Sequence, residues 1–113
     1  MAGGCGLGVL DAAKEQQVWG IGVDADQSYL GKQVLTSALK RVDTSVYSTI
    51  KQVLAGKFHG GTNAVFSLAN DGVGLGKISP SVPKADVEKV QQVAKQIADG
   101  KISNIPTEVL VQH

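Results

Sequence analysis

Two features of the sequence have residue types and a spacing that suit the binding of a polar ligand. The chain opens with a glycine-dense turn that includes Gly3 and Gly4, and Asp24 follows Gly4 by 20 residues. A glycine-rich turn that begins a helix exposes backbone N–H groups, which suit an anion or a polar ligand oxygen. In a dinucleotide-binding βαβ unit, an acid at about this distance accepts hydrogen bonds from ribose hydroxyls.

The dinucleotide pattern is incomplete in this chain. If Gly4 begins it, Val9 stands where the third glycine is required, and no strand precedes the turn. A nucleotide-dependent enzyme that uses the glycine turn therefore stays an alternative, beside a tight turn that binds nothing. For Asp24 the competing interpretation is an acid that closes a turn after a strand. For Lys40 and Arg41 it is a solvated pair at a strand end.

Other reactive side chains are isolated from one another. His59 and His113 lack a second ligand at helical spacing, so we expect no metal site and no cofactor. Ser37 and Ser67 lack the sequence context of a nucleophile, which favours a protein that is not an enzyme. The single cysteine, Cys5, excludes an internal disulfide and is expected to be an inert residue in the turn.

Composition narrows the class of protein. The 113 residues carry a formal charge of +1, with 42% apolar and 19% charged residues, which is typical of one folded globular domain. The near-neutral charge argues against an electrostatic nucleic-acid binder. No apolar run approaches the roughly 18 residues that a membrane-spanning helix needs.

Three segments show the pattern of helices. Apolar spacing predicts helices over residues 7–15, from an N-cap at Asp43 to Leu54, and over residues 84–99, with Gly56 and Gly100 as stop signals. In the last of these, apolar residues recur every three or four positions and form one face: Val87, Val90, Ala94 and Ile97.

Short apolar runs between the helices predict strands, and the alternation indicates an α/β layered fold. The run at residues 18–23 suits a strand that is buried on both faces of a parallel sheet. Further strands or extended pieces are expected at residues 33–38, 64–69, 73–78 and 102–111, with loops at residues 28–32 and a turn at residues 70–72.

Three quoted segments carry a family resemblance. They are Ala2-Gly3-Gly4-Cys5-Gly6-Leu7-Gly8-Val9, Gly20-Ile21-Gly22-Val23-Asp24-Ala25-Asp26-Gln27, and Val34-Leu35-Thr36-Ser37-Ala38-Leu39-Lys40-Arg41-Val42-Asp43. Together with Lys57-Phe58-His59-Gly60-Gly61, Asn70-Asp71-Gly72-Val73-Gly74-Leu75 and Asp99-Gly100-Lys101-Ile102, the chain resembles the basic membrane lipoprotein family. These are substrate-binding proteins of ABC transporters, similar to purine nucleoside receptors. The likeness covers about the C-terminal third of the family's chain.

The resemblance implies a partial type I periplasmic-binding-protein-like fold, in which two α/β lobes hold the ligand between them. Residues 1–113 would form one partial substrate-binding domain, with residues 1–40 as the ligand-side segment of the C-terminal lobe. Residues 41–113 would supply the helices and strands that cross the hinge.

The resemblance also implies site residues and partners. The ribose-binding acid would be Asp24, its partner Lys40, and the loop contact Gly3 or Gly4. Apart from the resemblance, we interpret Asp26 and Gln27 as structural residues that hold the loop. The implied ligand is a nucleoside, the partner an ABC permease, and the location outside the cytoplasm on a lipid anchor. The chain shows no signal peptide pattern, and we expect a fragment that starts in mid-fold.

Two further expectations follow from an incomplete lobe. The fragment could be an α/β scaffold without a ligand, because a cut lobe leaves sheet edges and apolar surface uncovered. The apolar face on residues 84–99 must also pack against something, since an isolated helix of this length depends on packing. We therefore expect a homo-oligomer, with segments exchanged between copies.

Overall fold

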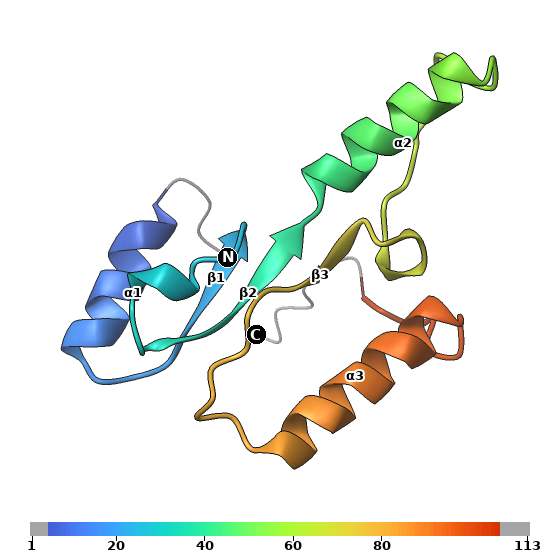
Figure 1. The fold of residues 1–113 in the computed structure, drawn as a ribbon. Helices are drawn as coiled ribbons and strands as arrows, with labels where there is room; N and C mark the ends of the chain where they lie inside the picture. Colours follow the sequence, from blue (N-terminus) through green and yellow to red (C-terminus); the bar gives the residue numbers. More distant parts are fainter. Residues whose placement is uncertain (1–4, 107–113) are drawn as a thin grey trace, which may run out of the picture.

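The computed structural model describes residues 5–106, and the predicted loop contacts Gly3 and Gly4 lie outside them, as do residues 107–111 of the last expected strand. The chain forms a small α/β layered structure (Figure 1). In chain order the elements are helix α1 (Gly6–Glu15), strand β1 (Gly20–Asp24), 3₁₀ helix η1 (Ser28–Leu30), strand β2 (Val34–Lys40), helix α2 (Val42–Leu54), 3₁₀ helix η2 (Leu68–Asn70), strand β3 (Val73–Leu75) and helix α3 (Lys84–Ala98).

The three strands form one mixed sheet in the order β1-β2-β3. Strand β1 runs parallel to β2, and β3 pairs with β2 in the antiparallel sense. Backbone bonds extend this second pairing beyond β3, because the Gly76 N–H donates to the Ser37 carbonyl at 2.8 Å and the Ser79 N–H to the Leu35 carbonyl at 2.8 Å. Because β1 and β2 are parallel, their C-terminal ends lie side by side at one end of the sheet.

The buried core lies between α1 and the first two strands. Leu10 and Ala13 of α1 and Val34 of β2 are its buried apolar residues. The helix approaches β1 so closely that a Cβ at Gly20 would lie 2.5 Å from Leu10 Cδ2, so any side chain at this position would force Leu10 to move. The predicted parallel pairing is present. The predicted burial of β1 on both faces was wrong: Ile21 is 61% exposed, because no helix among residues 5–106 covers that face.

The predicted helices are present, and one predicted cap is wrong. Helix α2 begins at Val42 with Arg41 as its N-cap, which places Asp43 inside the first turn. Asp43 bonds the Arg41 guanidinium there instead of capping. Gly56 and Gly100 both follow a helix end with positive φ values of 64° and 72°, as expected of stop signals.

Residues 64–69 do not form the expected strand. The Ser67 hydroxyl accepts from the Ala69 N–H, and the Asn70 side chain accepts from the Ser67 N–H at 2.7 Å. This capping box starts η2 and diverts the chain from extended pairing. Residues 28–32, expected as a loop, contain η1, and residues 102–106 pair with no strand.

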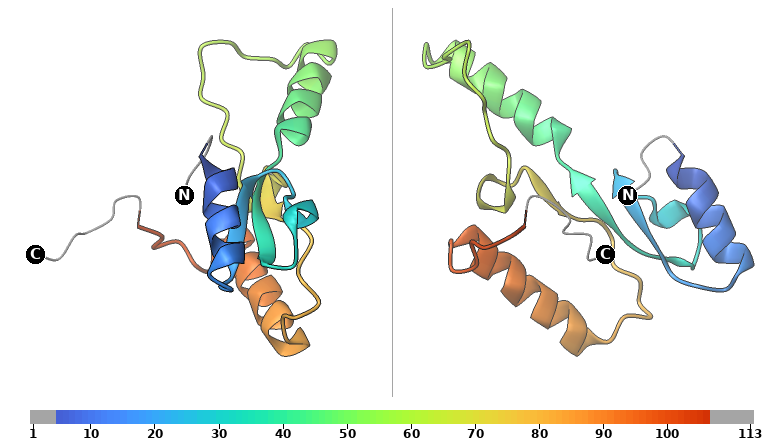
Figure 2. Two further views of the ribbon diagram at one scale, coloured as in Figure 1. Left: turned by 90° about the vertical axis from the view of Figure 1, so that its left-hand side faces the viewer. Right: turned by 180° about the vertical axis from the view of Figure 1, so that it is seen from behind.

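Much of the chain projects away from this core. Helix α2 has no buried residue and extends outward as an arm (Figures 1 and 2). Helix α3 lies beyond β3, whereas α1 packs beside β1 at the opposite end of the strand order (Figure 1). The Cα radius of gyration is 16.9 Å, against about 13 Å for a closed domain of this length. The chain exposes 9054 Å² of surface, where a closed protein of its mass exposes about 5900 Å².

Candidate functional site

Asp24 and Lys40 lie together at the edge where β1 and β2 end. Asp24 is the last residue of β1 and is in register with Leu39, so Lys40 at the end of β2 is its neighbour across the sheet. The Lys40 Nζ lies 3.1 Å from Asp24 Oδ1, and both side chains are more than half exposed. Ligands of open α/β sheets bind outside the carboxyl ends of parallel strands, which is the position of this pair.

The backbone at Asp24 has an uncommon conformation. Its φ is +70°, in the region that residues other than glycine rarely adopt. The Ala25 N–H donates to the Val23 carbonyl at 2.9 Å, so the chain makes a three-residue γ-turn centred on Asp24. Turns of this type with positive φ are rare and strained. Such strain persists only where the surrounding structure enforces it.

The segment after the turn is fixed to the strands by polar side chains. Gln27 Oε1 accepts from the Val23 N–H at 3.0 Å, and the Ser37 Oγ accepts from the Gln27 N–H at 3.0 Å. Ser37 is completely buried in β2. Asp26 Oδ1 accepts from the Ser28 N–H at 3.1 Å. The expectation that Asp26 and Gln27 hold this loop is therefore confirmed.

Arg41, next to Lys40, forms an ionic network that the sequence did not reveal. Its Nε lies 3.2 Å from Asp43 Oδ1 and its Nη1 lies 3.4 Å from Asp71 Oδ1. The hydrogen bond with Asp43 raises the pKa of Arg41, and the charges of Asp43 and Asp71 add to this. In turn, the Arg41 hydrogen bond holds the pKa of Asp43 below its ordinary value, helped by the Thr44 N–H. The Arg41 guanidinium is thus paired with two carboxylates, those of Asp43 and Asp71.

The Arg41 network was found only from the fold. Asp43 stands two residues from Arg41 in the sequence, but Asp71 is 30 residues away on the turn before β3. No spacing rule connects them. The expected turn is present, with Asp71 at a φ of 57°, and it carries this carboxylate to the end of β2.

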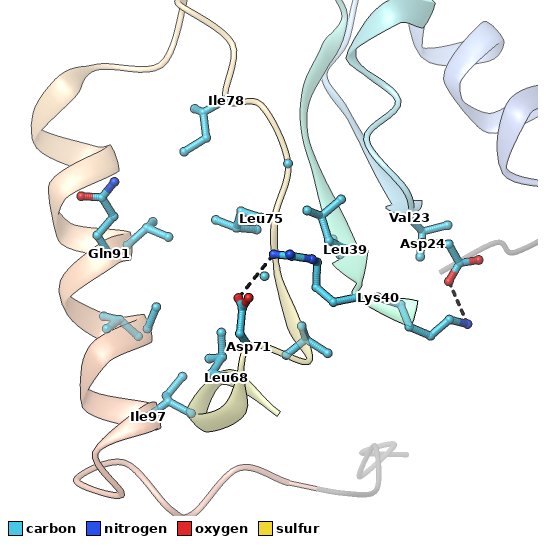
Figure 3. A pocket seen from close by; sticks show the side chains of 18 residues that line it. Val23, Asp24, Leu39, Lys40, Leu68, Asp71, Leu75, Ile78, Gln91 and Ile97 are labelled. Atoms are coloured by element: carbon cyan, nitrogen blue, oxygen red, sulfur yellow. Dashed lines mark hydrogen bonds and ion pairs between the residues drawn. The ribbon is translucent and has the colours of Figure 1, made fainter. Parts of the chain in front are cut away.

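A groove of about 1100 Å³ separates the sheet from α3 and includes the Asp24–Lys40 pair at its margin (Figure 3). In Figure 3, the Asp24–Lys40 ion pair lies on the far side of β2 from Gln91 and Ile97 of α3. The residues that line the groove are mostly apolar, and three of them belong to the predicted apolar face of α3. The main apolar contributors are Leu39, Leu75, Ile78, Val90, Ala94 and Ile97.

The remaining candidates stay apart from this site. Cys5 is a free, exposed thiol before α1, and His59 is exposed on the loop after α2. Within residues 5–106, no three side chains of His, Cys, Asp or Glu come together as a metal site. No helix in that same stretch is long and apolar enough to cross a membrane.

A family model and several known proteins are similar to this chain. Residues 1–107 match the Bmp family, described as "ABC transporter substrate-binding protein PnrA-like". The ABC transporter nucleoside-binding protein BmpA of Lactococcus lactis is 38% identical over 90% of this chain and 34% of its own length.

Solved structures share the arrangement of elements. A structure from Bacillus halodurans, described as a transcriptional activator of the comK gene, superposes with a TM-score of 0.80 at 27% identity, covering 88% of this chain and 35% of its own. An ABC transporter solute-binding protein from Conexibacter woesei gives a TM-score of 0.67 at 28% identity, covering 89% and 34%. This chain spans about a third of the length of the curated relatives it matches.

Proposed function

This chain belongs to the Bmp family of ABC transporter substrate-binding proteins, and we propose that its Asp24–Lys40 pair is the ribose end of a nucleoside-binding half-site. The predicted family, the partial periplasmic-binding-like α/β fold and the non-enzymatic class are confirmed by these relatives. The nucleotide-dependent enzyme is therefore set aside, and the glycine turn needs no catalytic role.

One observation carries the proposal: an acceptor carboxylate and a donor ammonium lie side by side at the carboxyl ends of parallel strands. The Asp24 carboxylate can accept from two vicinal hydroxyls, and the Lys40 ammonium can donate to a sugar oxygen. Such a pair is neutral in sum, so a lobe that closes over it with an uncharged sugar buries no unmatched charge.

The neighbouring charges also favour a nucleoside over a nucleotide. A phosphate is favoured by a cation that is free to pair with it, and the Arg41 guanidinium is already engaged by Asp43 and Asp71. The lactococcal relative named as nucleoside-binding supports the same ligand class. We propose that Gly3 or Gly4 supplies a backbone contact to the ligand, although both precede the described residues.

The ligand test uses a full-length relative into which this chain is grafted as the matching third. Adenosine should bind the graft, and Asp24→Ala should weaken binding by a charge-assisted contact of about 1.5–3 kcal/mol, with Lys40→Ala acting in the same direction but less. Asp24→Ala should also remove discrimination against dideoxyadenosine, which lacks both vicinal hydroxyls. The chain alone offers half of the contacts, and losing about 4 kcal/mol of them weakens binding about a thousandfold.

The matched control is Asp11→Ala. Asp11 is an exposed carboxylate on α1 and belongs neither to the loop after β1 nor to the ion pair. Unchanged sugar selectivity in Asp24→Ala, or an equal loss in Asp11→Ala, would refute the ribose assignment. Submicromolar adenosine binding by the chain alone, measured by calorimetry, would contradict the half-site.

We further propose that a second copy of this chain covers the apolar groove when the chain is isolated. The support is the exposed area, which is larger than that of a closed protein of this mass, so an interface between two copies has apolar surface to bury. The groove and the arm-like α2, with exposed Val46, Ile50 and Leu54, contribute to that surface.

Light scattering at micromolar concentration tests self-association, and the expected mass is that of a dimer or larger. A variant with charge on the groove wall, Val90→Glu, should return the chain toward a monomer, while Val9→Glu on the exposed side of α1 serves as the control. A stable monomer that unfolds cooperatively would show that one chain suffices.

In a complete family member we propose that the partner is the ABC permease and that the protein acts outside the cytoplasm on a lipid anchor. The support is the family itself and a relative from Pyrococcus abyssi that is named a lipoprotein, 32% identical over 99% of this chain and 27% of its own length.

A further inference from the structure

We propose that Gln27 and Ser37 are positioning residues that hold the Asp24 carboxylate in its ligand-ready orientation. The inference rests on the proposed nucleoside function and concerns the same site. It names two side chains that would set the affinity for the ribose hydroxyls without touching the ligand.

The first step of the argument is the strained turn. Asp24 has a φ of +70° within a γ-turn, and a chain free to relax would leave that conformation. Its own pairing with Lys40 cannot enforce the turn, because both side chains are more than half exposed and exposed ion pairs contribute little. Another part of the structure must hold the backbone on both sides of Asp24.

The second step identifies the restraint. Gln27 Oε1 accepts from the Val23 N–H, the last amide before Asp24, at 3.0 Å. The Gln27 N–H donates to Ser37 Oγ, also at 3.0 Å, which ties the returning chain to β2. Gln27 therefore bonds Val23 on one side of the turn through its side chain and the buried Ser37 hydroxyl through its backbone. We call Gln27 and Ser37 the latch.

The third step is the burial and fit of the latch. Ser37 is 0% exposed, and its carbonyl is also bonded by the Gly76 N–H at 2.8 Å, so its position is fixed by the sheet. A Cβ at Gly22 would lie 2.5 Å from Ser37 Oγ and 2.7 Å from Gln27 Oε1. Gly22 therefore leaves the space that the latch occupies. Figure 2 shows η1, which follows Gln27, on the side of the strands opposite α1.

The fourth step separates positioning from general stability. The buried apolar residues of the core, Leu10, Ala13 and Val34, lie where α1 packs on the strands, and neither latch residue is among them. Losing the latch should release the turn while α1 and the sheet stay in place. The consequence should then be local: Asp24 leaves positive φ, its carboxylate moves from Lys40, and the pair no longer presents two matched groups.

The experiment compares deletion variants with close controls in the full chain, followed by nuclear magnetic resonance. Ser37→Ala removes the buried hydroxyl, and Ser28→Ala removes an exposed hydroxyl in the same loop that bonds only Asp26. Gln27→Met removes the acceptor at equal length, and Gln27→Glu restores an oxygen at the same reach. The three-bond HN–Hα coupling and the intraresidue HN–Hα contact of Asp24 report its φ.

In Ser37→Ala and Gln27→Met, we expect the positive-φ signature of Asp24 to disappear and the Gln27 or Val23 amide, respectively, to exchange about tenfold faster. Ser28→Ala and Gln27→Glu should keep the signature. If Ser37→Ala fails to fold, the half-buried Gln27 pair of variants decides the question. A positive φ at Asp24 in Gln27→Met would overturn the proposal.

The same variants in the grafted full-length relative test the consequence for ligand. Ser37→Ala and Gln27→Met should weaken adenosine binding about tenfold and reduce the preference for adenosine over dideoxyadenosine, whereas Ser28→Ala should change affinity by less than twofold. If Asp24→Ala leaves selectivity intact, the proposed function fails. If Asp24→Ala abolishes selectivity and both latch deletions preserve it, only the positioning role fails.

Discussion

Replacing Asp24 by glycine should stabilise the chain relative to Asp24→Ala, although both variants lose the same carboxylate. Asp24 holds a φ of +70°, which costs a residue with a side chain about 1–2 kcal/mol. Glycine removes this cost but loses about 0.4–1 kcal/mol through the greater freedom of its unfolded chain. Asp24→Gly should therefore be more stable than Asp24→Ala by roughly 1 kcal/mol.

The comparison with the parent chain follows from the ion pair. Both variants lose the contact of 3.1 Å between Asp24 and Lys40, which at this exposure is worth about 0.2–1 kcal/mol. Asp24→Ala keeps the strain as well, so its free energy of unfolding should fall below that of the parent. Asp24→Gly should lie within about 1 kcal/mol of the parent, because the relief of strain offsets the lost ion pair and the greater freedom of the unfolded chain.

Urea unfolding at one fixed protein concentration measures these differences as shifts of midpoint at constant slope. Gln17 is the matched control, because it also has a positive φ, of 54°, and lies on the loop between α1 and β1. Gln17→Gly should likewise exceed Gln17→Ala. If the Gln17 pair shows the glycine advantage and the Asp24 pair does not, Asp24 is unstrained and the reasoning is refuted.

Two further predictions concern the core and the Arg41 network. Leu10→Ala should lower the free energy of unfolding by about 3 kcal/mol, because Leu10 of α1 is 2% exposed where the helix packs on β1. Leu54→Ala, at 83% exposure, should change it by no more than about 0.5 kcal/mol. Equal effects of the two variants in urea unfolding would contradict this core. The Asp43 carboxyl should titrate below its ordinary pKa of about 3.9 in a carbon-detected resonance titration, and Arg41→Gln should raise the midpoint. Because the folded-state pKa is lowered, this contribution to stability is present above pH of about 4 and is lost as pH falls through the lowered pKa; a midpoint unaffected by Arg41→Gln would contradict the pairing.

Local patterns were sufficient for most of the secondary structure. Apolar spacing placed α1, α2 and α3 within one or two residues of their bounds, and the two apolar runs before Asp24 and Lys40 gave β1 and β2. The failures have local physical causes. The apolar run at residues 64–69 was overridden by the Ser67–Asn70 capping box, and Asp43 was displaced from the N-cap by its bond to Arg41.

The candidate site was only partly accessible from the sequence. The family resemblance singled out Asp24 and Lys40, and their adjacency follows once β1 and β2 are paired in parallel. The partnership of Arg41 with Asp71 depends on an antiparallel return of β3, which no spacing in the sequence specifies. The exposure of Ile21 was missed for a similar reason, because an apolar run does not tell which of its faces the same chain covers.

The segment from Gly20 to Gln27 ends β1 in a sharp turn and presents a carboxylate there. Gly20 lets Leu10 pack against the strand, and Gly22 leaves the space that the side chains of Ser37 and Gln27 occupy. Asp24 then turns with positive φ, and Gln27 returns to bond the amide before it and the hydroxyl of Ser37. Contacts within residues 10–37 thus shape the strand and the turn that carry Asp24, while its partner Lys40 comes from the end of β2. These contacts do not set the affinity of the site, because Asp24 and Lys40 stay open to water until another surface closes over them.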